Sequence, residues 1–160
     1  MTAKELEHVV HAYYEDVLRY FVYRVRDRVL AEDLTQETFY RLLRYSSNGV
    51  SFASEKKCKA YLFTVASNVQ KDWYAKNTPH DALDESIPAQ NGESELPLVI
   101  ESAVAKLPDV QREAVVLYYY SGFRIREIAK IQGVTVSAVK SRLKTARDTL
   151  RTILSKEGFV

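Results

Sequence analysis

Hydrophobic residues recur three and four positions apart along most of the chain, which is the period of an amphipathic helix. This pattern predicts helices over residues 2–24, 31–44, 55–76, 98–106 and 109–120. The chain contains only 5 Gly and 4 Pro, which favours helices over a turn-rich β fold. The inward face of the first helix is predicted to consist of Leu6, Val9, Val10, Tyr13, Tyr14, Val17, Leu18, Phe21 and Val25.

Three of the later helices also have an apolar side that we expect to face the core. Pro108 precedes the last of them, at the position where proline is tolerated at a helix start. The predicted inward positions are Leu34, Thr38, Phe39, Leu42 and Leu43 in the second helix, Leu62, Val65, Ala66 and Val69 in the third, and Val110, Ala114, Val115, Leu117 and Tyr118 in the fifth.

Residues 124–151 have the pattern of two short helices around a tight turn. Ala129 is small where a second helix must cross closely, and Gly133 stands where the chain needs a positive φ to leave the first helix. Thr135 or Ser137 is expected to cap the next helix. This pattern predicts a helix-turn-helix whose second helix reads DNA. The inward stripe comprises Ile125, Ile128 and Ala129, then Val139, Leu143, Ala146 and Leu150.

A second stripe of basic residues follows the last helix about 100° from the apolar stripe. A solvated basic face on a core helix would have the same pattern. The spacing of Ala129, Gly133 and Val139 favours DNA binding instead. The basic stripe is Lys140, Lys144, Arg147 and Arg151, and the exposed half expected to enter a major groove is Ser137, Ala138, Lys140, Ser141 and Lys144.

The composition is that of a globular protein, with 46% hydrophobic and 28% charged residues among 160. No apolar run approaches the roughly 20 residues of a membrane span, and the first residues lack the apolar core of a signal peptide. The single cysteine, Cys58, excludes an internal disulfide. These features predict a cytoplasmic protein without membrane insertion. His8 and His11 share a helix turn without further ligands nearby, so we expect surface residues rather than a metal site.

Charge is distributed unevenly along the chain. Residues 77–97 contain five acids, no Lys or Arg, and three of the four prolines, which predicts a flexible acidic linker. Residues 98–160 carry 11 Lys and Arg against 6 Asp and Glu, a balance that suits a polyanion partner. The chain is therefore predicted to form two helical domains, 1–76 and 98–160, joined by this linker.

The second and third predicted helices each carry a candidate binding face. Asp33, Gln36, Glu37 and Tyr40 gather on one side of the second helix, which is either a solvated acidic face or a docking surface for a basic partner. The third helix mixes lysines with aromatic residues, a combination that suits stacking on unpaired bases and neutralising phosphates. An aromatic core with solvated lysines is the alternative. The residues are Lys56, Lys57, Lys59 and Lys71 with Tyr61, Phe63, Trp73 and Tyr74.

Three segments resemble the small, extracytoplasmic-function type of bacterial RNA polymerase sigma factor, in the sigma-70 family. Residues 31–39, Ala-Glu-Asp-Leu-Thr-Gln-Glu-Thr-Phe, look like the helix that docks on the clamp coiled coil of the polymerase. Residues 60–68 with Lys-Asp-Trp at 71–73 look like the part of region 2 that opens the −10 element. Residues 107–113 and the helix-turn-helix look like region 4, which reads the −35 element. The resemblance covers nearly the whole chain.

The resemblance implies an all-α, two-domain alternative sigma factor without catalysis or cofactor of its own. It also implies binding to the clamp and flap of core RNA polymerase, to promoter DNA and to an anti-sigma factor, in a stress response. The implied −35 residues are Ser137, Lys140, Ser141, Arg142, Lys144 and Arg147; the −10 residues are Lys56, Lys57, Tyr61, Thr64, Asn68 and Lys71; and the polymerase-facing residues are Asp33, Gln36 and Glu37.

Two positions depart from the family pattern. Ser67 stands where an arginine is common before Asn68, and Thr145 stands where an arginine is common in the recognition helix. Both changes remove a possible phosphate or guanine contact.

Two other classes of protein compete with this interpretation. A helix-turn-helix regulator acting as a homodimer would need a self-associating N-terminal half and a palindromic site. That half lacks the alternating strands of a receiver domain and an obvious dimer seam. A metal-dependent nuclease is disfavoured, because the sequence contains no metal-ligand cluster, nucleophile elbow or phosphate-cradling glycine loop.

Overall fold

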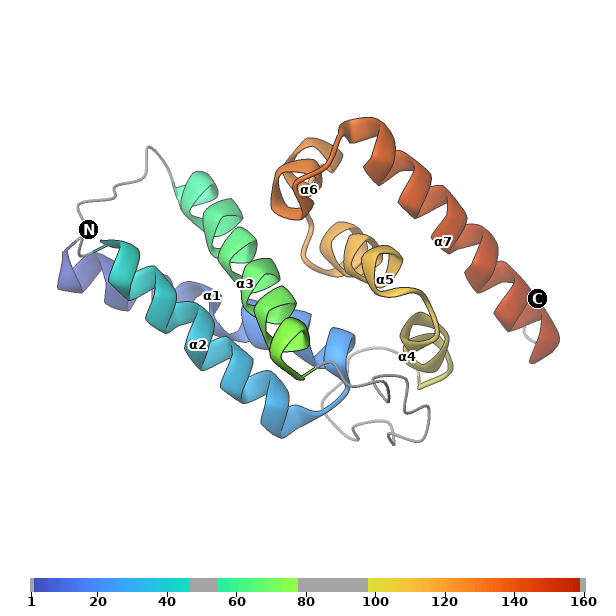
Figure 1. The fold of residues 1–160 in the computed structure, drawn as a ribbon, viewed down its shortest axis with the longest axis horizontal. Coiled ribbons are helices and arrows are strands. Elements are labelled where there is room, and N and C mark those ends of the chain that lie inside the picture. Colours follow the sequence, from blue (N-terminus) through green and yellow to red (C-terminus); the bar gives the residue numbers. More distant parts are fainter. Residues whose placement is uncertain (1, 47–54, 78–97, 159–160) are drawn as a thin grey trace.

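The computed structural model describes residues 2–46, 55–77 and 98–158, and over these residues the chain is helical, with no strand (Figure 1). The predicted all-α fold is confirmed. The predicted linker lies almost wholly outside the described residues. The helices are α1 (Ala3–Val25), α2 (Arg28–Ser46), α3 (Glu55–Asn77), α4 (Leu98–Ala105), α5 (Asp109–Val115), α6 (Ile125–Gln132) and α7 (Val136–Lys156), with a π-helix (Val116–Tyr120) continuing α5.

Helix α1 begins and ends with well-defined caps. Thr2 Oγ1 accepts from the backbone N–H of Glu5 at 3.1 Å, and the Glu5 carboxylate accepts from the Thr2 N–H at 2.7 Å, which is a capping box. The helix ends at Arg26, whose φ of 53° is left-handed. Helix α1 packs against α2, and α2 packs against α3, so the first three helices form one bundle. Phe21, Leu42 and Leu62 are fully buried within it.

The helix-turn-helix forms as the sequence predicts. Gly133 ends α6 with a φ of 69°, and the Val134 N–H donates to the Ala129 carbonyl at 2.9 Å. Thr135 Oγ1 caps α7 by accepting from the Ala138 N–H at 3.1 Å. Helices α5 and α6 both pack on α7, and Val139 is fully buried between them.

Most predicted inward positions are buried, but three are exposed. Leu43 is 46% exposed, since α1 and α3 cover the side of α2 that carries Leu42, and Leu43 lies about 100° further round. Val110 is 45% exposed in the first turn of α5. Tyr118 is 38% exposed in the π-helix, whose wider i→i+5 turn breaks the period used for the prediction.

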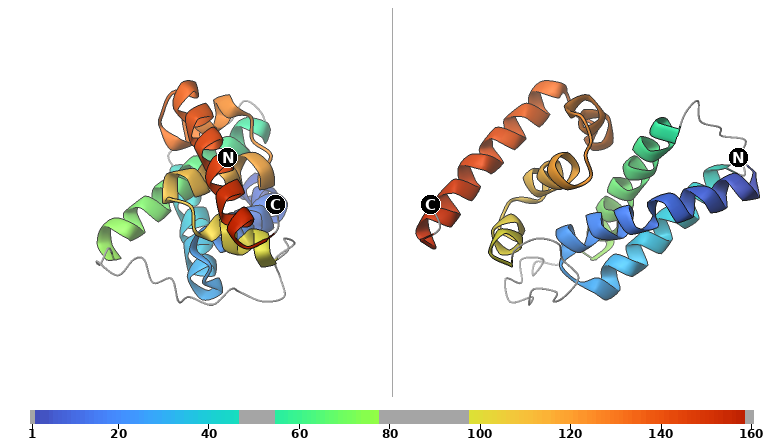
Figure 2. Two further views of the ribbon diagram at one scale, coloured as in Figure 1. Left: turned by 90° about the vertical axis from the view of Figure 1, so that its right-hand side faces the viewer. Right: turned by 180° about the vertical axis from the view of Figure 1, so that it is seen from behind.

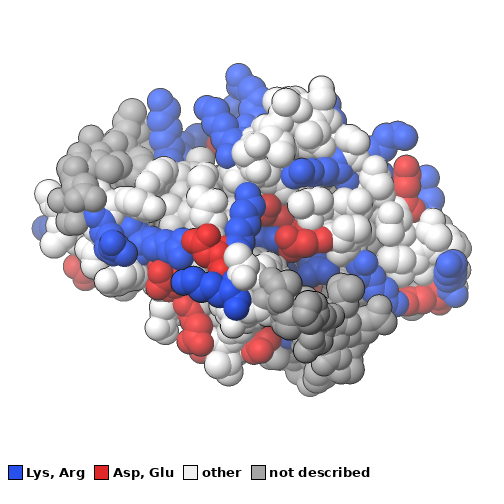
Figure 3. Space-filling view, in the orientation of Figure 1, with Lys and Arg blue, Asp and Glu red and all other residues white. Residues whose placement is uncertain are grey.

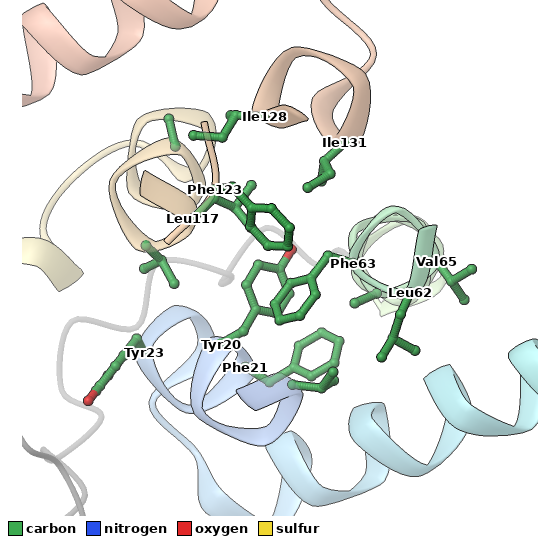
Figure 4. Packing of buried hydrophobic residues seen from close by; sticks show 14 of the residues in the cluster. Tyr20, Phe21, Tyr23, Leu62, Phe63, Val65, Leu117, Phe123, Ile128 and Ile131 are labelled. Atoms are coloured by element: carbon green, nitrogen blue, oxygen red, sulfur yellow. The ribbon is translucent and has the colours of Figure 1, made fainter. Parts of the chain in front are cut away.

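The two groups of helices, α1–α3 and α4–α7, pack directly against each other (Figure 2). Helix α3 contacts α6, while α1 contacts α4, α5 and the π-helix. Rings from both groups meet in the core: Phe63 of α3 packs edge-on against Tyr20 of α1 at 5.4 Å and against Phe123 at 4.9 Å between ring centroids (Figure 4). The sequence did not predict this contact, which makes one continuous core of both halves.

Candidate nucleic-acid interface

The N-terminal half of α7 presents an accessible polar and basic face. The predicted residues Ser137, Lys140, Ser141 and Lys144 are all exposed. The Lys144 side chain is 79% exposed, and its ammonium lies 4.0 Å from the Asp148 carboxylate, which is a weak exposed pair. Lys and Arg side chains stand along the edge of the molecule where α6 and α7 lie (Figure 3). Four of the six predicted −35 residues are therefore free to meet a duplex.

The other two residues predicted for this face, Arg142 and Arg147, have partners within the protein. Arg142 is half-buried, and its Nη1 donates to Gln132 Oε1 at 3.0 Å. Arg147 is exposed, and its Nη1 donates to the Tyr119 hydroxyl at 3.2 Å. Both guanidiniums are held at the edges of the α7 face, which suits phosphate contacts better than base contacts.

Helix α3 brings the predicted −10 residues to its outward side. Tyr61 and Thr64 are half-buried. Burial, and to a smaller extent the nearby Tyr45, raises the pKa of the Tyr61 hydroxyl. The Tyr45 and Tyr61 rings meet at 6.0 Å, so Tyr61 belongs to an exposed aromatic edge. The Thr64 hydroxyl donates to the Ala60 carbonyl at 3.1 Å. The exposed members of the set are Lys56, Lys57, Asn68 and Lys71.

One aromatic residue of α3 does not belong to this surface. Phe63 was predicted among the rings available for base stacking, but it is fully buried against Tyr20 and Phe123. The prediction was wrong because the α4–α7 helices cover this side of α3. Trp73 and Tyr74 are half-buried with ring centroids 5.4 Å apart, so each keeps part of its ring accessible.

The predicted docking face of α2 is accessible. Asp33 and Gln36 are exposed, whereas Glu37 is half-buried and accepts from Arg41 Nε at 3.0 Å. Tyr40 is 55% exposed, and Leu43 adds apolar surface further along the helix. The sequence analysis predicted that Leu43 faces the core, so it did not count this side chain as part of the exposed face.

An apolar groove of about 370 Å³ lies between α4, the π-helix and α7. Sequence patterns did not reveal it, because its walls come from four separate elements, α4, the end of α5, the π-helix and α7. Arg147 and Arg151 are its charged lining residues. The apolar lining includes Ile100, Val104, Val115, Tyr119, Leu150 and Leu154.

Comparisons with known proteins match both halves of the chain. The sigma-70 region 2 family model matches residues 9–79, and the sigma-70 region 4 model matches residues 98–150. The ECF RNA polymerase sigma factor EcfG of Rhodopseudomonas palustris is 35% identical over 136 residues, covering 80% of this chain and 73% of the relative. The chain is an extracytoplasmic-function sigma factor. Helices α1–α3 lie within the region 2 match, apart from the first turns of α1. The region 4 match begins with α4 and extends through most of α7.

Other relatives of this sigma factor agree in length and arrangement. The ECF RNA polymerase sigma factor SigM of Bacillus subtilis is 28% identical over 160 residues, covering 94% of this chain and 96% of the relative. The solved structure of the sigma factor RpoE in complex with the anti-sigma factor NepR from Bartonella quintana aligns with a TM-score of 0.76 at 25% identity. That alignment covers 96% of this chain and 98% of the RpoE chain.

The family assignment settles the main functional alternative. The protein is an alternative sigma factor, which works with RNA polymerase to direct promoter recognition, and the homodimeric regulator is not favoured.

Within the described residues no group of three or more His, Cys, Asp or Glu is placed to hold a metal. Among the helices that the structure describes, none combines the length and apolar character needed to cross a bilayer. Cys58 is buried.

Proposed function

We propose that this sigma factor reads the −35 element with the exposed face of α7 and holds the opened −10 element on the outward side of α3. The observation that carries this proposal is that two polar, basic faces lie on the matched region 4 and region 2, each on one helix and each accessible. Lys140, Ser141 and Lys144 reach base edges in the major groove, while Arg142 and Arg147 meet phosphates.

Promoter opening on α3 is driven by stacking and charge rather than by a reactive side chain. Extruding a base from a duplex costs a few kcal/mol. Stacking on a protein ring returns about 1–3 kcal/mol per base. Tyr61 offers an accessible ring edge, Asn68 offers amide hydrogen bonds to a flipped base, and Lys56, Lys57 and Lys71 follow the phosphates. We infer that the protein is a non-catalytic, cytoplasmic subunit without a cofactor.

Two surfaces suit the polymerase itself. The α2 face of Asp33, Gln36 and Glu37 docks on the clamp coiled coil, with Tyr40 and Leu43 adding apolar contact. The groove between α4, the π-helix and α7 accepts an apolar segment of the flap. The proposed domains are residues 1–76 and 98–160, with 77–97 as linker. The solved RpoE–NepR complex supports an anti-sigma factor as a further partner.

Run-off transcription with purified core polymerase tests this function. Core polymerase alone and core polymerase with this chain are compared on a promoter library. Specific transcripts that need the chain support the proposal. Absence of any chain-dependent transcript, together with failure to bind core polymerase, contradicts it.

A further inference from the structure

Tyr119 is an exposed tyrosine whose hydroxyl is bound by a residue of the recognition helix. It belongs to the π-helix that continues α5, and it is 50% exposed. Arg147 of α7 donates from Nη1 to the Tyr119 hydroxyl at 3.2 Å. Within the described part of the chain, this hydroxyl accepts that bond and donates none. A tyrosine hydroxyl can accept and donate at once, so its own proton is available to an outside acceptor.

The π-helix gives Tyr119 this position. The Ser121 N–H donates to the Val116 carbonyl at 2.9 Å, which is the i→i+5 bond of a π turn. In this turn Leu117 is buried, whereas the next two residues, Tyr118 and Tyr119, are both exposed. Short π segments within α-helices occur frequently at functional sites. Here the π turn places the Tyr119 hydroxyl beside α7, within reach of Arg147.

The surroundings of the Tyr119 hydroxyl favour an anion. Arg147 and Arg151 are one turn apart on α7, both are exposed, and both line the groove that Tyr119 also lines. Among the described residues that line this groove there is no Asp or Glu. A guanidinium beside a hydroxyl presents positive charge together with several hydrogen-bond donors, which is the chemistry that binds a phosphate.

The site also lies at the right distance from the residues that face the bases. Lys140 and Arg147 are on one side of α7, and the seven positions between them correspond to roughly 10 Å along the helix. A major groove is about 12 Å wide and has a phosphate backbone at each edge. When the first half of α7 enters the groove and Lys140 meets base edges, Arg147 and Tyr119 therefore lie near a bordering phosphate.

We propose that the Tyr119 hydroxyl and the Arg147 guanidinium together bind one backbone phosphate beside the −35 element. The inference rests on the proposed function, because the −35 duplex supplies the phosphate. Arg147 provides the charge and an N–H donor. Tyr119 provides a neutral O–H donor and holds the guanidinium in place through the bond that it accepts. Tyr119 is thus a DNA-binding residue that lies outside the helix-turn-helix.

The two partners can be told apart because only one of them is charged. Binding of a cationic side chain to DNA releases counterions, so loss of Arg147 should reduce the slope of log affinity against log salt by about 0.9. Loss of the Tyr119 hydroxyl changes no charge, so affinity should fall while the slope stays the same. Because both groups act on one phosphate, their effects should not be additive.

Promoter binding by the holoenzyme tests this site. Core polymerase with the full chain is titrated, over graded salt, with a promoter fragment that gives a chain-dependent transcript. We expect Tyr119→Phe to weaken binding roughly threefold to tenfold at every salt concentration. In an Arg147→Ala background the same change should cost less than about twofold. Tyr118→Phe removes a hydroxyl from the neighbouring exposed ring and is the matched control, with parental affinity expected.

Neutral backbone substitutions locate the phosphate. Single phosphates along the −35 element are replaced by methylphosphonates, and each duplex is titrated with the parent and Tyr119→Phe holoenzymes. At one position the substitution should weaken the parent clearly and the Tyr119→Phe variant much less, because that variant has already lost part of the contact. A purely structural role for Tyr119 would instead weaken every duplex by the same factor and would overturn the inference.

Three further results would overturn it. The first is parental promoter affinity in the Tyr119→Phe holoenzyme, and the second is an equal loss in Tyr118→Phe. The third is weaker core binding by Tyr119→Phe with unchanged promoter affinity once the holoenzyme is assembled, which would assign Tyr119 to the groove alone. A parent holoenzyme that does not bind promoter DNA would contradict the proposed function itself, and this inference with it.

Discussion

Arg142 of the recognition helix and Gln132 of the preceding helix are joined across the helix-turn-helix by a hydrogen bond of 3.0 Å from Nη1 to Oε1. Gln132 also donates to the Val110 carbonyl at 3.1 Å, so it connects α7 to α5 as well. The orientation of the reading helix is thus fixed by polar contacts in addition to the buried Val139 and Leu143. A rigid recognition helix presents its exposed side chains to DNA in one geometry.

Replacing Lys140 or Ser141 with Ala is therefore expected to weaken binding to a −35 duplex. Both side chains are exposed beside the buried Val139, so their loss removes a DNA contact without disturbing the core. Each specific contact is worth about 1–3 kcal/mol. Gel-shift titration at fixed salt measures the change, with Lys156→Ala at the far end of α7 as control. Equal affinities for the variants and the parent would exclude this face.

The change Asn68→Ala is expected to slow promoter opening and to leave polymerase binding intact. Asn68 is exposed on the outward side of α3, and its amide is the only polar group lost. Permanganate footprints of the −10 element on the assembled holoenzyme measure opening. Lys76→Ala, an exposed change two turns further along α3, is the control. Footprints as strong and as rapid as those of the parent would count against the assignment.

The double change Asp33→Ala with Glu37→Ala is expected to weaken binding to core polymerase. The two acids share one face of α2, and Asp33 is exposed, whereas Glu37 already pairs with Arg41. Most of the loss should consequently come from Asp33→Ala alone. Pull-down of core polymerase at graded salt measures it. Glu32→Ala, on the same helix and paired with Arg28, is the control. Undiminished capture by the double variant would rule out this docking face.

The parts of the fold that local signals specify could be predicted from the sequence. Gly133 and Thr135 are residues whose backbone and side-chain chemistry define the turn of the helix-turn-helix, and both act as expected. The buried face of α3 could also be predicted from the helical spacing of its apolar residues, as Leu62 and Val69 illustrate. The candidate DNA-binding faces could be predicted because each is the polar, basic side of a single helix that also has an apolar side.

The contact between the regions could not be predicted, because it depends on residues far apart in the chain. Tyr20 and Arg24 were not among the predicted inward residues of α1, yet both are buried and both bond to Glu113 of region 4. Arg24 and Glu113 are 89 positions apart, and nothing in the local pattern of either indicates a partner. The apolar groove was missed for the same reason, since its walls come from four separate elements.

Acid is expected to destabilise the folded protein through Glu113. Burial raises the pKa of this carboxyl, but the Arg24 charge and the hydrogen bonds from Tyr20 and Gln132 outweigh burial, so the pKa lies below its ordinary value of 4.5. A carboxyl with a lowered pKa in the folded state contributes stability that is fully present above pH 4.5 and is lost as the pH falls through the lowered pKa. Urea unfolding of the full chain between pH 7 and pH 3 measures this loss.

The variant Glu113→Gln separates this carboxyl from the others that titrate in the same window. Glu5 also has a lowered pKa, mainly because its carboxylate accepts from the Thr2 backbone N–H, so the parent loses stability in acid from at least two sites. The amide of Glu113→Gln keeps the shape but neither titrates nor balances the Arg24 charge. We therefore expect the variant to be less stable at pH 7 and its stability to fall less steeply below pH 4.5. Parallel curves for the variant and the parent would show that Glu113 is not held ionised by Arg24.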